Sequence, residues 1–287
     1  MEKKQFMNSN NDKKREMKRD IQEVVSELME KVINRVLNED PFIPEEHRTK
    51  KPLYAALVPK EIFKGSHFER RFVTPFGKLW EKLAIVAAEN GMGHGEMDYK
   101  VEGKIKEGRL RRISEVLNKL EHGVRGGDRI KPNWEEELQY ILEGDGDPVD
   151  TTVICDVLAE NTTTGEKFVF ELKAPLPNSD QTKVSKEKIF KLHSMEPETI
   201  NEAYFALPYN PYGKKEDYAW SFPARWFDMN NDPCVLIGIE FWEKIGGEGT
   251  YRAFIEAVNE IGVEYKEQIY REYLGIEPPN DLGEESL

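Results

Sequence analysis

Two acidic residues and a lysine interrupt strongly apolar, β-branched runs in the middle of the chain. Asp156 follows TTVIC, and Glu171 and Lys173 stand in KFVFELKA, with fourteen residues between Asp156 and Glu171. Ionised groups in a buried strand cost free energy unless each is paired or bound to a metal. Mg²⁺ prefers hard oxygen ligands, and it can polarise a phosphate while lowering the pKa of a bound water. These residue types therefore indicate metal-assisted phosphodiester cleavage.

The spacing of these residues predicts a β-hairpin that brings them together. If the chain turns at Thr163–Thr164, residues whose numbers sum to about 327 lie opposite each other, and Asp156 faces Glu171. Directly opposed residues have Cβ atoms about 4.5–5.5 Å apart, so both carboxylates can bind one cation. Side chains two positions apart on a strand share a face, which places Lys173 beside Glu171. Lys173 is then expected to orient or help deprotonate the attacking water and to stabilise the developing charge.

The same residues also fit a simpler interpretation, an exposed hairpin whose polar face reads Asp, Glu, Lys. The apolar residues around the charges favour the functional interpretation. Asp150 is the alternative first carboxylate, but the predicted register places it beyond the end of the Glu171 strand. A further carboxylate is expected from Glu81 in GKLWEKLA, although a surface glutamate beside Lys78 and Lys82 fits equally well.

Several separated motifs resemble, in order, those of the TdeIII family of type II restriction endonucleases. The segment ELKAPLPNSDQTKVSK is similar to the family's E-x-K, its Pro-Asn pair, and its Gln before a lysine-bearing helix. SHFERRFVTPFGKLWEKLA upstream, and YNPYG and VLIGIEFWEKIGG downstream, match too. The resemblance covers roughly Lys51 to Gly262. The residues match the PD-(D/E)XK pattern only in part. Cys155 stands where the pattern has a proline before Asp156, and the nearest preceding proline is Pro148.

The resemblance implies an α/β fold of the PD-(D/E)XK restriction-endonuclease class, with a central mixed sheet flanked by helices and a helical N-terminal part. It implies Mg²⁺-dependent cutting of double-stranded DNA by a homodimer at a short palindromic, GGNCC-like site. It also implies a cognate DNA methyltransferase as a partner in the same system. The catalytic set is then Asp156, Glu171 and Lys173, and the metal ligands are Asp156, Glu171, Leu172 and Glu81. The expected contacts to the DNA backbone on the next helix and its lead-in are Asn178, Gln181, Lys183 and Lys186.

The loop from Tyr209 to Asn231 gathers polar, basic and aromatic residues that can reach base edges and phosphates. The expected DNA contacts in this loop are Asn210, Tyr212, Lys214 and Arg225. The alternative is a surface loop that packs its aromatic side chains on the core, with Arg225 buried against Trp226 or paired with Asp228. The base-reading residues would then be sought among Arg109, Arg111, Arg112 and Arg125, of which the first three also fit a solvated helix face.

Hydrophobic periodicity predicts helices on both sides of a β-rich middle. Residues 12–38 read as one long amphipathic helix, expected either to dock on the chain's own core or to form the dimer. Further helices are expected over 77–90, 110–120, from 134, 181–193 and 250–273. Strands are expected in VDTTVICDVLA, KFVFELKA, EAYFALPY and PCVLIGIE, and GMGHGE at 91–96 is expected to be a flexible loop.

This order of elements predicts a single mixed α/β nuclease domain over residues 1–287. Within it, residues 1–75 are expected to form a helical N-terminal region that can serve in dimerisation. Residues 76–262 are expected to form the catalytic core, and residues 263–287 the end of the last helix and an acidic tail.

The net charge of −13 at pH 7 is unusual for a protein that binds a polyanion. Residues 231–287 hold thirteen acidic and four basic residues, a net of −9, which leaves −4 for residues 1–230. Basic clusters remain there at Lys13–Arg19, Lys104–Arg112 and Lys183–Lys191. A nuclease also concentrates carboxylates around its metal. The acidity therefore argues against a simple DNA-coating protein, but not against a nuclease.

Cys155 and Cys234 lie in β-branched apolar runs and are expected to be reduced, buried strand residues. No apolar run is long enough to span a bilayer, and the charged start is not a secretory signal, so a cytoplasmic protein is expected. The five histidines show no ligand spacing. Two other functions fit parts of the pattern: a repair or junction-resolving nuclease of the same fold, and a non-catalytic DNA- or protein-binding module.

Overall fold

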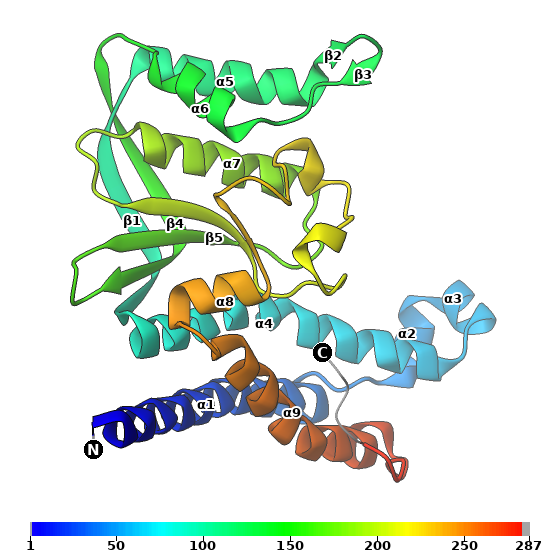
Figure 1. Ribbon diagram of the computed structural model, residues 1–287. Coiled ribbons are helices and arrows are strands. Elements are labelled where there is room, and N and C mark those ends of the chain that lie inside the picture. The colour runs from blue at the N-terminus through cyan, green and yellow to red at the C-terminus, as the bar shows by residue number, and fades with distance from the viewer. Residues whose placement is uncertain (1, 283–287) are drawn as a thin grey trace. The chain divides into compact units, whose positions relative to one another are not determined.

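A computed structural model describes residues 2–282, with side chains described from Lys14 onward except that of Arg125. The chain divides into two compact units, Met1–Leu83 with Arg252–Leu287, and Ala84–Tyr251. The first unit is helical, and the second combines a mixed sheet with helices (Figure 1), which confirms the predicted α/β class. The region boundaries predicted from the sequence, after residues 75 and 262, differ from the boundaries of these two units. The single nuclease domain over residues 1–287 stays a prediction.

The first unit joins helices from both ends of the chain. They are α1 (Glu2–Asn34), the π-helix η1 (Arg35–Glu39), α2 (Pro44–Lys50), α3 (Pro52–Leu57), most of α4 (Lys60–Gly91), most of α9 (Thr250–Gln268) and the π-helix η4 (Ile269–Leu274). The apolar stripe of α1, which includes Ile21 and Val25, is buried because three- and four-residue steps place it on one face. Lys18 and Gln22 of α1 donate to the Glu260 carboxylate of α9 at 2.5 and 2.9 Å. The stripe therefore docks within its own chain.

The sheet of the second unit has, among the described residues, the strand order β1-β4-β5-β6-β7. The strands are β1 (Gly93–Lys106), β4 (Pro148–Asn161), β5 (Lys167–Leu172), β6 (Glu202–Leu207) and β7 (Val235–Ile237). β1, β4 and β5 are antiparallel neighbours, whereas β5, β6 and β7 run parallel. Parallel neighbours need a crossover connection, and α7 (Ser179–Ser194) provides it between β5 and β6.

Helices cover both faces of this sheet. α5 (Glu107–His122), α6 (Trp134–Leu142) and α7 stack over one face (Figure 1), and the main apolar core lies between these helices and the sheet. On the other face α8 (Ile239–Gly246) places Phe241 edge-on against Phe170 of β5, with ring centroids 5.6 Å apart. β5 is thus buried on both sides, which explains why a nearly continuous apolar run forms it.

The hairpin of β4 and β5 has the predicted register. Val157 pairs with Phe170, and the numbers of paired residues sum to 327 along the ladder. The turn is favoured locally, because the Asn161 side chain accepts hydrogen bonds from the backbone N–H groups of Thr163 and Thr164 at 3.0 and 3.2 Å.

The prediction of a flexible loop at GMGHGE is wrong. β1 begins at Gly93, and Gly95 pairs with Ala159 of β4. A Cβ at Gly95 would lie 3.0 Å from the Cβ of Ala88 in α4. The glycine therefore permits a close approach between helix and strand, whereas the sequence interpretation read it as a sign of flexibility.

The prediction for PCVLIGIE is only partly right, because the strand is short. β7 covers Val235–Ile237, the chain turns at Gly238, and α8 begins at Ile239. Cys155 and Cys234 are both free and buried, as predicted. Across residues 2–282, no helix combines the length and apolar character needed to cross a membrane.

Lys186 of α7 is fully buried, at 0% exposure. Its Nζ lies 2.5 Å from the Glu137 carboxylate of α6 and also donates to the Trp226 carbonyl. Three aromatic rings lie 5.0 to 5.9 Å from the same ammonium, those of Trp134, Phe190 and Phe227. The expected DNA contact by Lys186 is therefore wrong, because the interior of the protein separates this charge from any phosphate.

Asp232 lies near this buried pair and is itself only 5% exposed. Burial raises the pKa of its carboxyl to about 6, although the Lys186 charge and a hydrogen bond from the Asp228 N–H, at 2.9 Å, favour ionisation. A carboxyl whose folded-state pKa exceeds its unfolded value destabilises the fold once it is ionised. The stability contribution of neutral Asp232 is thus present below the ordinary pKa of 3.8 and lost as the pH rises through about 6.

We predict that Asp232→Asn raises the free energy of unfolding by about 1–3 kcal/mol at pH 8, because the amide resembles the neutral carboxyl. The gain should shrink as the pH falls from about 6 toward about 4, where the wild-type carboxyl becomes protonated. Urea unfolding of both proteins over this range measures the difference. Asp217→Asn, at an exposed position of the same loop, is the control. A variant no more stable than wild type at pH 8 would contradict the burial argument.

Candidate active site

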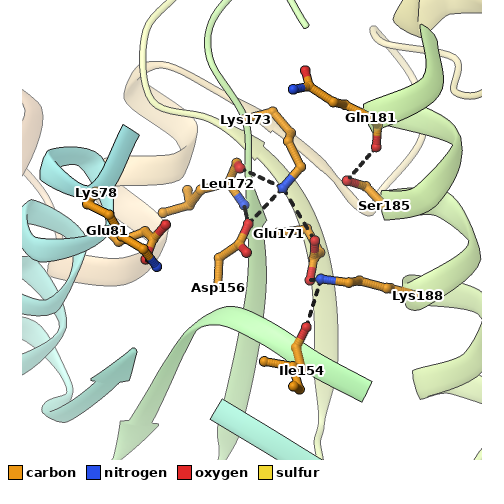
Figure 2. A network of polar contacts seen from close by, with 10 residues as sticks. All are labelled: Lys78, Glu81, Ile154, Asp156, Glu171, Leu172, Lys173, Gln181, Ser185 and Lys188. Atoms are coloured by element: carbon orange, nitrogen blue, oxygen red, sulfur yellow. Dashed lines mark hydrogen bonds and ion pairs between the residues drawn. The ribbon is translucent and has the colours of Figure 1, made fainter. Parts of the chain in front are cut away.

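Asp156 of β4 converges with Glu171 and Lys173 at the end of β5 (Figure 2). Asp156 Oδ2 accepts hydrogen bonds from the Leu172 backbone N–H and from Lys173 Nζ, both at 2.8 Å. Lys173 Nζ also lies 3.4 Å from Glu171 Oε2 and 2.8 Å from the Leu172 carbonyl oxygen. Oxygens from three of the expected metal ligands therefore surround one cationic nitrogen.

Glu171 is 1% exposed and has a second cation beside it, Lys188 of α7. Lys188 Nζ donates to Glu171 Oε1 and to the Ile154 carbonyl, both at 2.7 Å (Figure 2). Burial raises the pKa of the Glu171 carboxyl, and the charge of Asp156 raises it further, whereas Lys173 and Lys188 oppose the rise. The two lysines thus favour the ionised carboxylate that a metal site requires.

Lys173 is held in its charged form by the carboxylates. Burial lowers the pKa of its ammonium, but the charges of Asp156 and Glu171 outweigh burial, and the net pKa lies above its ordinary value. The Lys173 backbone N–H donates to the Ala206 carbonyl of β6 at 3.1 Å. Pairing with β6 therefore continues past the end of β5 and fixes the position of the lysine.

The arrangement fits a divalent cation that prefers oxygen ligands. Asp156, Glu171 and the Leu172 carbonyl already direct oxygens at a positive centre, and Mg²⁺ accepts such ligands while keeping several waters. No three His, Cys, Asp or Glu side chains form a possible ligand group in the part of the chain that the structure describes. A metal held by this unit would therefore depend on two carboxylates, one main-chain carbonyl and water.

The sequence also predicts two other candidate carboxylates for the site, Glu81 and Asp150. Glu81 lies in α4 of the first unit, where its carboxylate is 2.6 Å from the Lys78 ammonium, and its role as a metal ligand stays a prediction. Asp150 faces Lys104 of β1 at 3.6 Å, and its side chain is 90% exposed. Asp150 lies in the part of β4 that pairs with β1 but not with β5, because the ladder with β5 begins only at Val157. It therefore stands away from Glu171, whereas Asp156 lies next to that ladder.

The N-cap and first turns of α7 hold three further expected DNA contacts. Asn178 caps the helix, since its Oδ1 accepts the Gln181 N–H at 2.8 Å, and the Gln181 side chain is exposed. Lys183 pairs with Glu121 of α5 and lies 5.6 Å from the Trp226 ring centroid. Asn178 and Lys183 thus have structural partners, and DNA contacts by all three residues stay predictions.

The loop after β6 uses Asn210 for a turn. Asn210 is 8% exposed, and its side chain accepts the Tyr212 N–H at 3.0 Å and donates to the Gly213 carbonyl at 3.2 Å. Its polar atoms therefore serve the loop, which leaves Tyr212 and Lys214 as the exposed candidates there.

Arg225 ends the short helix η3 (Pro223–Arg225) and is half-exposed. Its expected alternative partner, the Asp228 carboxylate, accepts hydrogen bonds from Asn230 and Asn231 instead. The three arginines of α5 are paired with glutamates: Arg109 with Glu196 at 2.9 Å, Arg111 with Glu115 at 3.6 Å and Arg112 with Glu143 at 3.4 Å. The side chain of Arg125 lies outside the described residues.

Lys188 is the residue of the site that the sequence interpretation missed. The sequence places Lys188 in the basic cluster Lys183–Lys191 but predicts no role for it. In the structure the lysines of this cluster point to different partners around the helix. A usable signal was the helical phase, because Ser185, Ile189 and Leu192 face the interior, and Lys188 stands at the edge of that buried face. The helical periodicity alone does not identify Glu171 as the partner of Lys188, because this contact joins α7 to strand β5, which lies elsewhere in the sequence.

Comparison with known proteins agrees with this geometry. The family described as "Type II restriction endonuclease, HinfI" matches residues 17–262. The chain is 24% identical over 228 residues to the type II restriction enzyme HgiBI of Herpetosiphon aurantiacus, which covers 78% of this chain and 81% of that protein. The type II restriction enzymes HgiEI and HgiCII of the same organism are each 25% identical, over 78% of this chain and 81% and 82% of theirs.

These matches refine the resemblance drawn from the motifs. The TdeIII family is supported only as far as it shares the type II restriction endonuclease class, because the matched family is that of HinfI. The match covers the strands with Asp156 and Glu171, the helix with Lys188, and the loop with Arg225. The chain belongs to the HinfI family of type II restriction endonucleases and is a site-specific deoxyribonuclease.

Proposed function

We propose that this enzyme cuts DNA in a Mg²⁺-dependent reaction at Asp156, Glu171, Leu172 and Lys173, on a core of the PD-(D/E)XK type. The convergence of three oxygens on Lys173 Nζ, at 2.8, 3.4 and 2.8 Å, carries the proposal. A strand with Glu-x-Lys beside a strand with Asp also follows the PD-(D/E)XK pattern, although Cys155 replaces the proline before Asp156.

The residues divide the chemistry among them. When bound, Mg²⁺ polarises the scissile phosphate and lowers the pKa of a coordinated water. Asp156 and Glu171 supply the negative charge that holds the ion, and Leu172 adds a carbonyl oxygen. Lys173 has a flexible four-carbon stem, so its ammonium can turn to the attacking water or a phosphate oxygen and stabilise the developing charge. Lys188 keeps Glu171 oriented through Oε1.

We further infer that the recognition site is a short palindrome bound by a homodimer, since two-fold symmetry of the protein mirrors that of such a site. A GGNCC-like sequence and a partner methyltransferase rest on the TdeIII resemblance alone. Glu81 is proposed as an additional metal ligand, and Tyr212, Lys214, Gln181 and Arg225 as DNA contacts.

We predict that Glu171→Gln and Asp156→Asn each lower kcat by roughly 10³-fold, because metal binding supplies several kcal/mol and each ~1.4 kcal/mol is tenfold. Glu171→Gln should also raise the free energy of unfolding at neutral pH, since the raised pKa of Glu171 means that its ionised form destabilises the fold. Cleavage of plasmid DNA in Mg²⁺ and urea unfolding measure the two effects.

Glu160→Gln is the matched control, because Glu160 is a carboxylate of the same strand, β4, that pairs with Lys167 and stands outside the site. It should cut like the wild type. An Asp156→Asn protein that cuts at a near wild-type rate would refute the proposed centre.

We predict that Lys188→Met lowers the cleavage rate by roughly 10- to 100-fold, the usual effect of losing a residue that orients a metal ligand. DNA affinity measured in Ca²⁺ should change little, because the Lys188 ammonium is already bonded to the Glu171 carboxylate and the Ile154 carbonyl. Lys191→Met, on the same helix and paired only with Glu187 in the described contacts, is the control. Equal cleavage by the two variants would leave Lys188 without a role in the reaction.

We predict a homodimer, with about twice the mass of the chain, by light scattering of the free and DNA-bound protein. The α1 stripe should not form the contact, because it is buried within its own chain. A monomer in both samples would contradict the dimer and the palindrome together.

A further inference from the structure

We propose that a basic cleft between the β2–β3 hairpin and η3 holds the sugar–phosphate backbone of the DNA beside the cutting site. β2 (Val124–Arg125) and β3 (Asp128–Arg129) form the hairpin that follows α5. The proposal rests on the proposed function and deepens it by locating where the flanking backbone binds.

The cleft has a volume of about 670 Å³ and is rich in positive charge. Arg129 and Lys131 line it from the hairpin side, and Arg225 and the exposed Phe222 line it from the loop side. Asp128 is the acidic residue in its lining, so cations exceed anions. In a chain of net charge −13, a cleft of this kind is suited to an anionic occupant.

The two arginines of the cleft differ from those of α5. Arg109, Arg111 and Arg112 each have a glutamate partner. For the guanidinium groups of Arg129 and Arg225, no ion pair with another described residue is found. Asp128 lines the same cleft but forms no ion pair with either guanidinium among the described contacts. Holding two arginines in one cleft without ion-pair partners costs repulsion, and a DNA phosphate would relieve it with charge-assisted hydrogen bonds.

Three hydrogen bonds tie the wall of the cleft to the segment after Lys173. Tyr218 donates to the Pro175 carbonyl at 2.9 Å, and Trp220 to the Pro177 carbonyl at 2.9 Å. The Trp226 indole, next to Arg225, donates to Ser179 Oγ at 3.0 Å. The loop that forms one wall of the cleft is thus fixed to residues 175–179, the segment that follows Lys173 of the candidate site.

The hairpin itself has a form that suits DNA. Gly126 and Gly127 both have positive φ, 63° and 94°, which permits a tight two-residue turn. The major groove of B-DNA admits a two-stranded β-ribbon. Figure 1 shows the hairpin beyond the ends of α5 and α6, on the same side of the second unit as the loop between β6 and β7. One side of the cleft can therefore approach a groove while its arginine holds the backbone.

The test is the double variant Arg129→Gln/Lys131→Gln, measured by fluorescence anisotropy on a labelled mixed-sequence duplex in Ca²⁺. A phosphate contact contributes about 0.9 to the slope of log affinity against log salt, so the slope should fall by about 2 and affinity by roughly tenfold. Cleavage of plasmid DNA in Mg²⁺ at subsaturating enzyme should slow in step with the lost affinity, because both residues hold the substrate. Arg129→Lys should keep its part of the salt slope.

The matched control is Lys100→Gln/Arg111→Gln, which changes the net charge equally at exposed positions of the same unit. An equal loss in both double variants would overturn the proposal, because the effect would then belong to net charge alone. A double variant that binds DNA like wild type but no longer dimerises would also overturn it, and would assign the cleft to a second copy of the chain. If the wild-type protein neither binds nor cuts duplex DNA, the proposed function itself is refuted. If the wild type binds and cuts and the Arg129→Gln/Lys131→Gln variant binds equally well, only the role of the cleft is refuted.

Discussion

Glu171 carries a carboxylate into a strand otherwise made of Phe, Val and Leu, and it is 1% exposed. A buried, uncompensated charge costs several kcal/mol, and the nearby charge of Asp156 adds repulsion. The ammonium groups of Lys173 and Lys188 offset both effects at 2.7 to 3.4 Å. The four side chains sum to zero charge. A bound divalent cation would leave a surplus of two positive charges, which complements an anionic phosphate better than a neutral substrate.

This charge balance depends on where α7 lies, because Lys188 reaches Glu171 from the helix layer. Two residues earlier, Lys186 is buried with Glu137 and the Trp226 carbonyl. Such a pair adds little net stability, but breaking it is strongly unfavourable, so it opposes any shift of α7 relative to α6. The Trp226 indole also bonds to Ser179 at the start of the helix. One helix therefore links the charge balance of the candidate site to the loop that carries Arg225.

Local features of the sequence predicted the hairpin, because its alternation and its turn residues act over a few positions. The register of β4 and β5, and with it the meeting of Asp156, Glu171 and Lys173, followed from this local information. Non-local contacts were not accessible in the same way. Which lysine of a basic helix is buried depends on the layer packed against that helix. Lys186 and Lys188 therefore pair with carboxylates of the interior, whereas Lys183 pairs with Glu121 of α5. The start of β1 was misread because glycine permits both a loop and a close helix–strand approach.

Basic clusters in a sequence do not measure the charge that a protein offers to DNA. The basic side chains of the cluster Lys104–Arg112 each pair with an acidic residue. Lys104 pairs with Asp150, Lys106 with Asp145, and Arg109, Arg111 and Arg112 with glutamates. The lysines of Lys183–Lys191 are likewise paired, with Glu121, Glu137, Glu171 and Glu187. Such pairs are already neutral and attract a phosphate weakly. On the proposed cleft, the affinity for DNA would come from cations that lack such partners, and the position of Arg129 and Arg225 would then matter more than the overall charge.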